Sequence, residues 1–288
     1  MSKNVILGLY DGYSSLDTIK GGLRLFIESL RFYNTDDKVV IFVQTKNVFP
    51  ELKTFAEKFN VELANFNEKD VLEFNEDRQT YRLLLYKNWL SNNAQFFDKI
   101  MLSDTNDVMF FGNPFLIETK SIYCALEKSR YKNHGENRSS VICNLGWLWY
   151  IGWQVNYENL SETCLNKSPI EKIIFNKNVV CSGTIIGKRD AVVKYLEEVT
   201  KNKLITYTGL DQGCWNKYVQ SQPPETLDMV RVEHSKILTL DSIDHLKIPK
   251  DEKGFYMNEV GERYLIVHQI DRGGNIGHFK QLHRKYHT

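Results

Sequence analysis

The amino-acid sequence predicts an α/β fold with a central, mostly parallel sheet, flanking helices and a smaller antiparallel part. Three observations support this class. Over the first hundred residues, short apolar runs alternate with amphipathic segments, the order in which strands and helices build parallel sheets. With 288 residues, 42% hydrophobic and 25% charged, the chain can bury a sizeable core. It contains no internal repeat or low-complexity linker, so we expect a single domain over residues 1–288.

In the first half of the chain, expected strands and helices alternate. The apolar runs that we interpret as buried strands cover residues 4–10, 38–44, 61–66 and 99–103. The helical segments between them cover residues 15–34, 49–60 and 79–92. Leu23, Phe26 and Leu30 recur at helical spacing in the first of these, and Pro50 suits the first turn of the second. In such sheets ligands bind at the carboxyl ends of the strands, so the residues directly after position 103 are candidate ligands.

The second half of the chain is less regular. It begins with an expected strand and an aromatic-rich segment, and it continues with a strand, a Ser-Gly bend, a second strand and a helix. A polar loop then leads into a short helix, and an apolar strand ends close to His268. These segments are residues 121–127, 141–153, 179–201, 208–219 and 263–275. The change of pattern near residue 115 divides the domain into residues 1–115 and 116–288.

Charge, cysteine content and apolar runs exclude several classes of function. A net charge of +1 gives no support to a nucleic-acid or anionic-membrane partner. The five cysteines form no C-x-x-C pair, which argues against a disulfide framework and a structural zinc site. Residues 141–153 are too short to span a membrane. Because the N-terminal sequence lacks a signal-peptide pattern, we expect a cytoplasmic protein. Its richness in Lys, Asn, Ile, Phe and Tyr is typical of an AT-rich microbe or large virus.

Two aspartates, Asp104 and Asp107, directly follow the apolar run 99–103 and precede a second apolar run. Neighbouring carboxylates repel each other unless a cation lies between them. Their oxygens are ligands that suit a hard ion such as Mg²⁺ or Mn²⁺. The alternative is that the sequence Asp-Thr-Asn-Asp only forms a turn, because Asp and Asn favour turns through hydrogen bonds to their own backbone.

The segment from Tyr81 to Phe115 combines a Tyr-Arg helix, an Asp-Lys pair before an apolar strand, two aspartates, and an apolar strand followed by Gly-Asn. This block resembles the central part of GT-A glycosyltransferases, especially those of the glycogenin and lipopolysaccharide galactosyltransferase type. Weaker resemblances extend it over most of the chain, in residues 28–43, 179–198, 209–216 and 264–272. The resemblance implies a Rossmann-like GT-A domain, with a nucleotide-binding half in residues 1–115 and an acceptor-binding half in residues 116–288.

The resemblance also implies a metal site. Asp104 and Asp107 match the metal-binding acids of the family, and His268 matches the histidine that completes the site. Two oxygens and one nitrogen favour Mn²⁺ over Mg²⁺. The family separates its acids by one residue, whereas two intervene here, so Asn106 is an alternative to Asp107 as the second ligand. A histidine after an apolar strand is also common as a purely structural residue.

Further residues are candidates for donor binding, for catalysis and for acceptor binding. The donor-binding candidates are Tyr10, Asp11, Arg78, Arg82, Asp104, Ser182, Gly183 and Arg272. The catalytic candidates are Asp211 and Gln212, and the acceptor candidates are Trp147 and Trp149. Several have a structural alternative: Arg78 and Arg82 can form surface ion pairs with Glu76 or Asp77, Asp211 can cap a helix, and the tryptophans can pack in the core.

The stereochemical outcome stays open at this stage. In an inverting enzyme a carboxylate deprotonates the acceptor hydroxyl, and Asp211 is the first candidate for that base. In a retaining enzyme, as the glycogenin resemblance suggests, the departing phosphate takes that proton and Gln212 lies beneath the anomeric carbon.

The expected function is a metal-dependent glycosyltransferase. It would transfer a sugar from a UDP-sugar, such as UDP-xylose, UDP-galactose or UDP-glucose, to a saccharide or a glycoprotein glycan. A noncatalytic carbohydrate- or nucleotide-binding protein with this fold is the alternative that the altered acid spacing keeps open. A sugar-phosphate nucleotidyltransferase is disfavoured, because the first strand is not followed by a Gly-rich loop that contains arginine.

Overall fold

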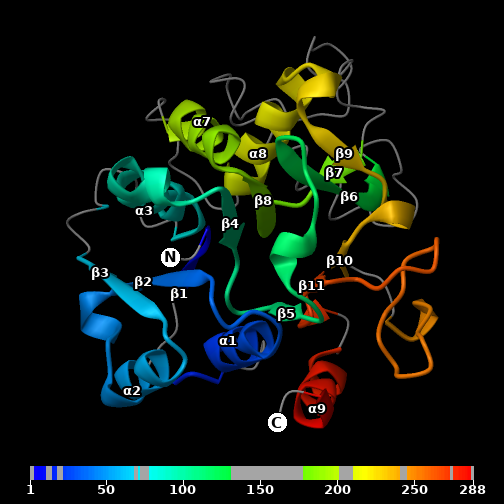
Figure 1. The fold of residues 1–288 in the computed structure, drawn as a ribbon, viewed down its shortest axis with the longest axis horizontal. Coiled ribbons are helices and arrows are strands. Elements are labelled where there is room, and N and C mark those ends of the chain that lie inside the picture. Colours follow the sequence, from blue (N-terminus) through cyan, green and yellow to red (C-terminus); the bar gives the residue numbers. More distant parts are fainter. Residues whose placement is uncertain are drawn as a thin grey trace, which may run out of the picture.

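The computed structural model is an α/β structure in which helices flank a large, mostly parallel sheet and a small second sheet adjoins it (Figure 1). It describes residues 3–10, 15–17, 22–67, 71, 78–130, 178–200, 210–240, 245–272 and 275–286. The α/β class expected from the sequence is confirmed.

The large sheet has the strand order β3-β2-β1-β4-β8-β6-β7, and β9 pairs with β6. Its first four strands run parallel, and β4-β8-β6-β7 are paired antiparallel. The bounds are β1 Asn4–Tyr10, β2 Lys38–Gln44, β3 Glu62–Phe66, β4 Lys99–Ser103, β6 Ile122–Arg130, β7 Asn178–Val180, β8 Thr184–Lys188 and β9 Asp228–Val230. In β1 every residue after Asn4 is buried, as expected for a central strand covered on both faces.

Helices cover both faces of the large sheet. The bounds are α1 Gly22–Tyr33, α2 Pro50–Lys58, α3 Arg78–Asn93, α7 Arg189–Thr200, α8 Leu210–Ser221 and α9 Ile276–Tyr286. Apolar residues of α3, α7 and α8 pack on one face, and those of α1 and α2 pack on the other (Figure 1). Short 3₁₀ turns lie at Thr45–Asn47, Ala94–Phe96, Pro114–Leu116, Pro224–Thr226, Val232–His234 and His245–Lys247. Within the described ranges, no helix combines the length and apolar character that crossing a membrane requires.

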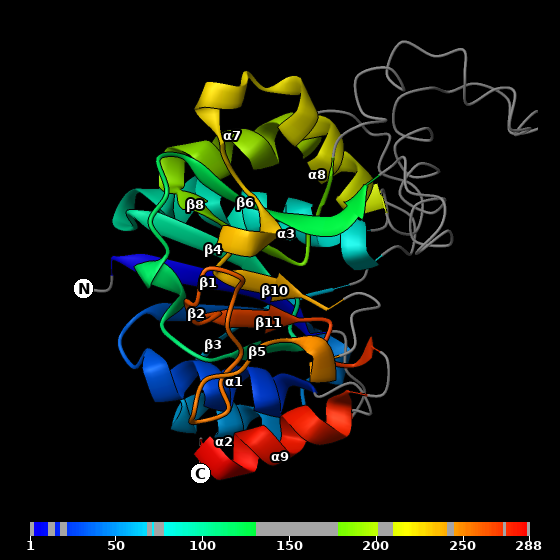
Figure 2. The same ribbon diagram turned by 90° about the vertical axis from the view of Figure 1, so that its right-hand side faces the viewer.

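The small sheet consists of β5 (Val108–Phe110), β10 (Ile237–Thr239) and β11 (Ile266–His268). The central strand β11 pairs parallel with β10 and antiparallel with β5, and its register places His268 opposite Val108. Figure 2 shows this sheet beside the large one, above α1 and α9. Because β5 follows β4 after a four-residue turn, the small sheet brings the C-terminal part of the chain to the carboxyl end of β4.

Most elements expected from the sequence are present. The first helix is an exception, because it begins at Gly22, whereas the expected segment began at residue 15. Gly22 has a φ of 81°, a left-handed conformation that glycine adopts at little cost, and its N–H donates to the carbonyl of Asn106 over 2.9 Å. The aromatic-rich segment 141–153, which includes Trp147 and Trp149, lies outside the described residues.

Candidate metal centre

The turn between β4 and β5 is held by three neighbouring parts of the molecule. The N–H of Asp104 donates to the carbonyl of Gly183 over 2.8 Å, and the hydroxyl of Thr105 donates to the carbonyl of Leu9 over 2.7 Å. Asn106 accepts the hydrogen bond from Gly22 at the start of α1. The turn is therefore fixed by β1, α1 and the segment before β8, and the directions of its two carboxylates are fixed with it.

His268, at the end of β11, reaches both carboxylates. Its Nε2 lies 3.2 Å from Oδ2 of Asp104 and 3.7 Å from Oδ1 of Asp107. One ligand atom from each of these three side chains can be chosen so that all lie within 4.8 Å of one another. The hydrogen bond from the N–H of Ile270 to the carbonyl of Asp107, 3.2 Å long, joins the strand end to the turn. We call these three residues, Asp104, Asp107 and His268, the acid-histidine group.

The charges of the acid-histidine group affect one another. Burial raises the pKa of Asp107 to about 6, although the charge of His268 opposes this. Burial acts in the same direction on Asp104, but the charge of Arg82 and the hydrogen bond with His268 outweigh it and lower the pKa of Asp104 well below its usual range. Burial also disfavours protonated His268, yet Cys181 and the two aspartates outweigh it and raise the pKa of His268. Two acids and a histidine thus share one small volume, and each affects the protonation of the others.

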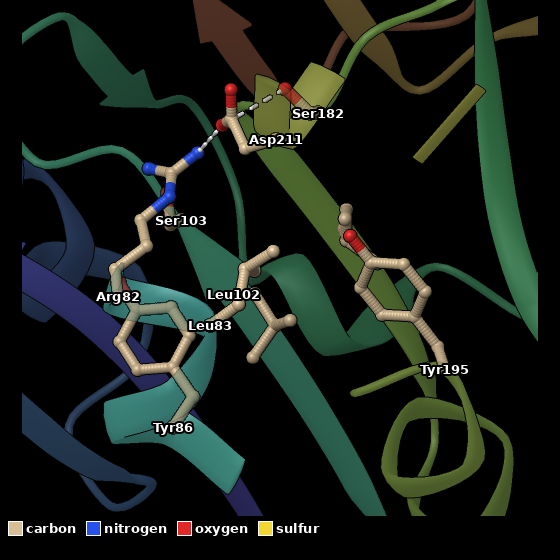
Figure 3. Close-up of a pocket in the computed structure, with 9 residues that line it drawn as sticks. Arg82, Leu83, Tyr86, Leu102, Ser103, Ser182, Tyr195 and Asp211 are labelled. Atoms are coloured by element: carbon tan, nitrogen blue, oxygen red, sulfur yellow. Dashed lines mark hydrogen bonds and ion pairs between the residues drawn. The ribbon is translucent and has the colours of Figure 1, made fainter. Parts of the chain in front are cut away.

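Arg82 of α3 bridges two carboxylates that lie far apart in the sequence. Its Nη1 pairs with Oδ1 of Asp104. Its Nη2 lies 2.6 Å from Oδ2 of Asp211, the second residue of α8 (Figure 3). The side chains of Arg82 and Asp211 are buried. Burial raises the pKa of Asp211, while the charge of Arg82 opposes that shift. Arg82 therefore forms a buried ionic bridge rather than a surface ion pair.

Arg82 and Asp211 also line a narrow cavity with Tyr86 and Tyr195 (Figure 3). The cavity volume is about 10 Å³, which is room for about one water molecule. Nε of Arg82 and the hydroxyls of both tyrosines are buried and have no hydrogen-bond partner within the described part of the chain. A nucleotide-sugar is far larger than this cavity and would have to bind on the open side of the acid-histidine group.

The segment between β7 and β8, Cys181-Ser182-Gly183, forms a second wall of the site. Oγ of Ser182 lies 3.4 Å from Oδ2 of Asp211 and 3.2 Å from Oε1 of Gln212. Gly183 lies so close to the acid-histidine group that a Cβ added there would be 2.2 Å from Cε1 of His268 and 2.7 Å from Oδ2 of Asp104. Only glycine allows the chain to pass at this distance.

The acid-histidine group fits a hard divalent cation. Two carboxylates and one imidazole match the donors that Mn²⁺ accepts, and an O-rich set also suits Mg²⁺. Asp104 presents Oδ2 toward His268, and the side chain is 31% exposed, so the group is open to solvent on one side. The missing Cβ at Gly183 leaves the space that such a group needs.

No protein-family model and no curated protein matches this chain. The functional assignment therefore rests on the motifs and on the geometry of the site.

The structure brings seven of the predicted site residues together. They are Arg82, Asp104, Asp107, Ser182, Gly183, Asp211 and His268, and Gln212 joins them through Ser182. Arg272 is exposed and close enough for its charge to lower the pKa of Asp107, against the effect of burial. Tyr10 does not join the group, because it is buried in the core beside α1 and its hydroxyl donates to the carbonyl of Ser15.

Four predicted site residues lie wholly or partly outside the described part of the structure: Asp11, Trp147, Trp149 and the side chain of Arg78. Sequence reasoning missed two features of the site. It did not pair Arg82 with Asp211, which is 129 positions away. It also assigned no role to Cys181, whose Sγ lies 3.1 Å from Nδ1 of His268.

Proposed function

We propose that this protein is a metal-dependent glycosyltransferase of GT-A architecture that uses a nucleotide-sugar, specifically a UDP-sugar, to glycosylate a saccharide or a glycoprotein glycan. One observation carries the proposal: Asp104, Asp107 and His268 meet at the carboxyl end of β4. This is the edge of a parallel sheet at which ligands bind. The resemblance of residues 81–115 to GT-A enzymes supports the same reaction.

The roles of the residues follow from their positions. Asp104, Asp107 and His268 would hold Mn²⁺ or Mg²⁺. When bound, the cation supplies positive charge that stabilises the diphosphate leaving group of the donor. Arg82 adds a fixed guanidinium beside Asp104, and a fixed charge needs no reorganisation during the reaction. Gln212 lies next to Ser182, where its amide can contact the donor sugar.

The geometry supports a role for Asp211 in orienting the side chain of Arg82. Its carboxylate is buried and faces Arg82 and the hydroxyl of Ser182. A general base must reach the proton that it removes from the acceptor. A carboxylate in this position is better suited to orient Arg82 than to contact an acceptor hydroxyl. Asp211 would then matter for the reaction through Arg82.

Thermal unfolding with UDP, with and without Mn²⁺, tests the proposal. UDP at about a hundred times its Kd should raise the melting temperature by roughly 5 °C when Mn²⁺ is present. UDP or Mn²⁺ alone should have a smaller effect. Asp104→Asn should lose the metal-dependent shift, whereas Asp190→Asn, on the exposed surface of α7, should keep it. Equal stabilisation of both variants would contradict the assigned site.

Release of UDP from a panel of UDP-sugars separates catalysis from binding. The glycosyltransferase proposal predicts slow metal-dependent hydrolysis of at least one of UDP-xylose, UDP-galactose and UDP-glucose. Metal-dependent UDP binding without release from any donor, with or without saccharide acceptors, would instead support the noncatalytic alternative.

A further inference from the structure

Cys181 lies on the far side of His268 from the two carboxylates. It follows β7 directly, and its side chain is buried, with 2% of the residue exposed. Its Sγ is 3.1 Å from Nδ1 of His268, while Nε2 of the same ring faces Asp104 and Asp107. The thiol therefore contacts the nitrogen that a metal at the acid-histidine group would leave free.

Both nitrogens of His268 need a suitable partner. To bind a cation, Nε2 must be unprotonated, so the neutral ring carries its proton on Nδ1 and needs an acceptor there. When Nε2 instead donates to Asp104, a neutral ring needs a donor at Nδ1. A thiol is both a weak donor and a weak acceptor. Cys181 can therefore complete either tautomer without moving.

The ring is also confined sterically. Gly183 borders Cε1 and Nε2, and a Cβ at that position would overlap them. His268 is thus held between the thiol on one side and the glycine backbone on another. A rotation of the ring away from the carboxylates would break the contact with Sγ.

We infer that Cys181 is a positioning residue that fixes the tautomer and the orientation of His268 for metal binding. The inference rests on the proposed metal site and adds a residue to it that touches neither metal nor substrate. Partners of this kind on the second nitrogen of a ligand histidine change metal affinity by about 10- to 100-fold when they are replaced. Cys181→Ala should therefore weaken Mn²⁺ binding by about tenfold or more, and Cys181→Ser, which keeps a donor and an acceptor, should retain most of the affinity.

Titration calorimetry with Mn²⁺ alone tests this on the full chain. The variants are Cys181→Ala, Cys181→Ser and His268→Ala, with Cys124→Ala as the matched control. Cys124 is another buried cysteine, and its thiol faces the carbonyl of Ile122. The control should keep wild-type affinity even if its melting temperature falls. Nitrogen NMR of the His268 ring gives a readout independent of activity: with Mg²⁺ as the diamagnetic ion, the proton should reside on Nδ1 in the wild type and in Cys181→Ser.

The outcomes separate the inference from the proposed function. If His268→Ala loses Mn²⁺ affinity and Cys181→Ala does not, the metal site stands and the role of Cys181 is refuted. Wild-type affinity in His268→Ala would overturn the metal site itself and this inference with it. If the serine variant binds as weakly as the alanine variant, the thiol acts by packing rather than by its hydrogen bond, which also contradicts the inference.

Discussion

The interior of the large sheet differs from the place where the large and small sheets meet, which we call the seam, in the kind of side chain that is buried. Around β1 the core is apolar, and Val5, Ile6 and Leu7 have no exposed surface. At the seam, the carboxyl end of β4 meets β11 and α8, and the buried groups there are Arg82, Asp211 and His268. Burying charge costs free energy that a pair recovers only in part. Charges gathered at the carboxyl end of β4, next to the apolar core around β1, therefore indicate a functional site rather than a source of stability.

Arg82→Met should have the largest effect and tests whether the seam depends on paired charge. The change leaves the carboxylates of Asp104 and Asp211 without their cation, and breaking a buried pair in this way costs about 3–5 kcal/mol. The free energy of unfolding, measured by urea titration, should fall accordingly. Arg189→Met, which removes an exposed partner of Asp190, should leave it unchanged.

Leu7→Ala gives the corresponding change in the apolar region. The free energy of unfolding should fall by a similar amount, about 2–5 kcal/mol, because the smaller side chain leaves a cavity in the core. Affinity for Mn²⁺ should survive in the fraction that remains folded. If Leu7→Ala weakened Mn²⁺ binding as much as Asp104→Asn, the two regions would not be functionally distinct.

Gly183→Ala should disrupt the seam without changing any charge. The added methyl group would overlap His268 and approach Asp104, so one of them must move. We expect at least a tenfold loss of Mn²⁺ affinity by calorimetry, as for other changes around ligand residues. Gly277→Ala is the matched control, because a Cβ there meets nothing within 4 Å. Because Gly277 lies in the first turn of α9, its replacement by alanine should leave the free energy of unfolding unchanged or raise it by up to about 1 kcal/mol. Equal affinities in the two variants would refute the close approach.

The pH dependence of stability gives a smaller effect. In the metal-free protein burial raises the pKa of Asp107 to about 6, so the folded state holds more protons than the unfolded state between about pH 4 and 6. The contribution of the Asp107 carboxyl to the stability of the folded state is therefore present below about pH 4 and is lost as the pH rises through about 6. Mn²⁺ needs the ionised carboxylate, so its affinity should increase over the same range.

Urea titrations between pH 4 and 7, with and without Mn²⁺, measure both effects. Asp107→Asn should remove this part of the pH dependence and should weaken Mn²⁺ binding at every pH. An unchanged pH profile in that variant would show that other groups cause the dependence.

Local patterns in the sequence predict much of the fold. The strands β1, β2 and β4 are continuous apolar runs because they are covered on both faces, so a single run identifies each of them. The start of α1 lies later than the apolar spacing predicts, because that spacing does not show that the N–H of Gly22 donates to the carbonyl of Asn106. The site was predictable where a motif is contiguous, as in the Asp104 turn. The pairing of Arg82 with Asp211 was not, because tertiary packing brings α3 and α8 together. The contact of Cys181 with His268 depends in the same way on how β7 and β11 approach each other.

Anomalous diffraction at the manganese edge, from crystals grown with Mn²⁺ and UDP, would locate the metal itself. If Asp104, Asp107 and His268 hold it, one strong peak should be bonded to carboxylate oxygens of both aspartates and to Nε2 of the histidine, with the diphosphate on its open side. A peak elsewhere, or UDP bound without a metal at this group, would contradict the proposed metal site.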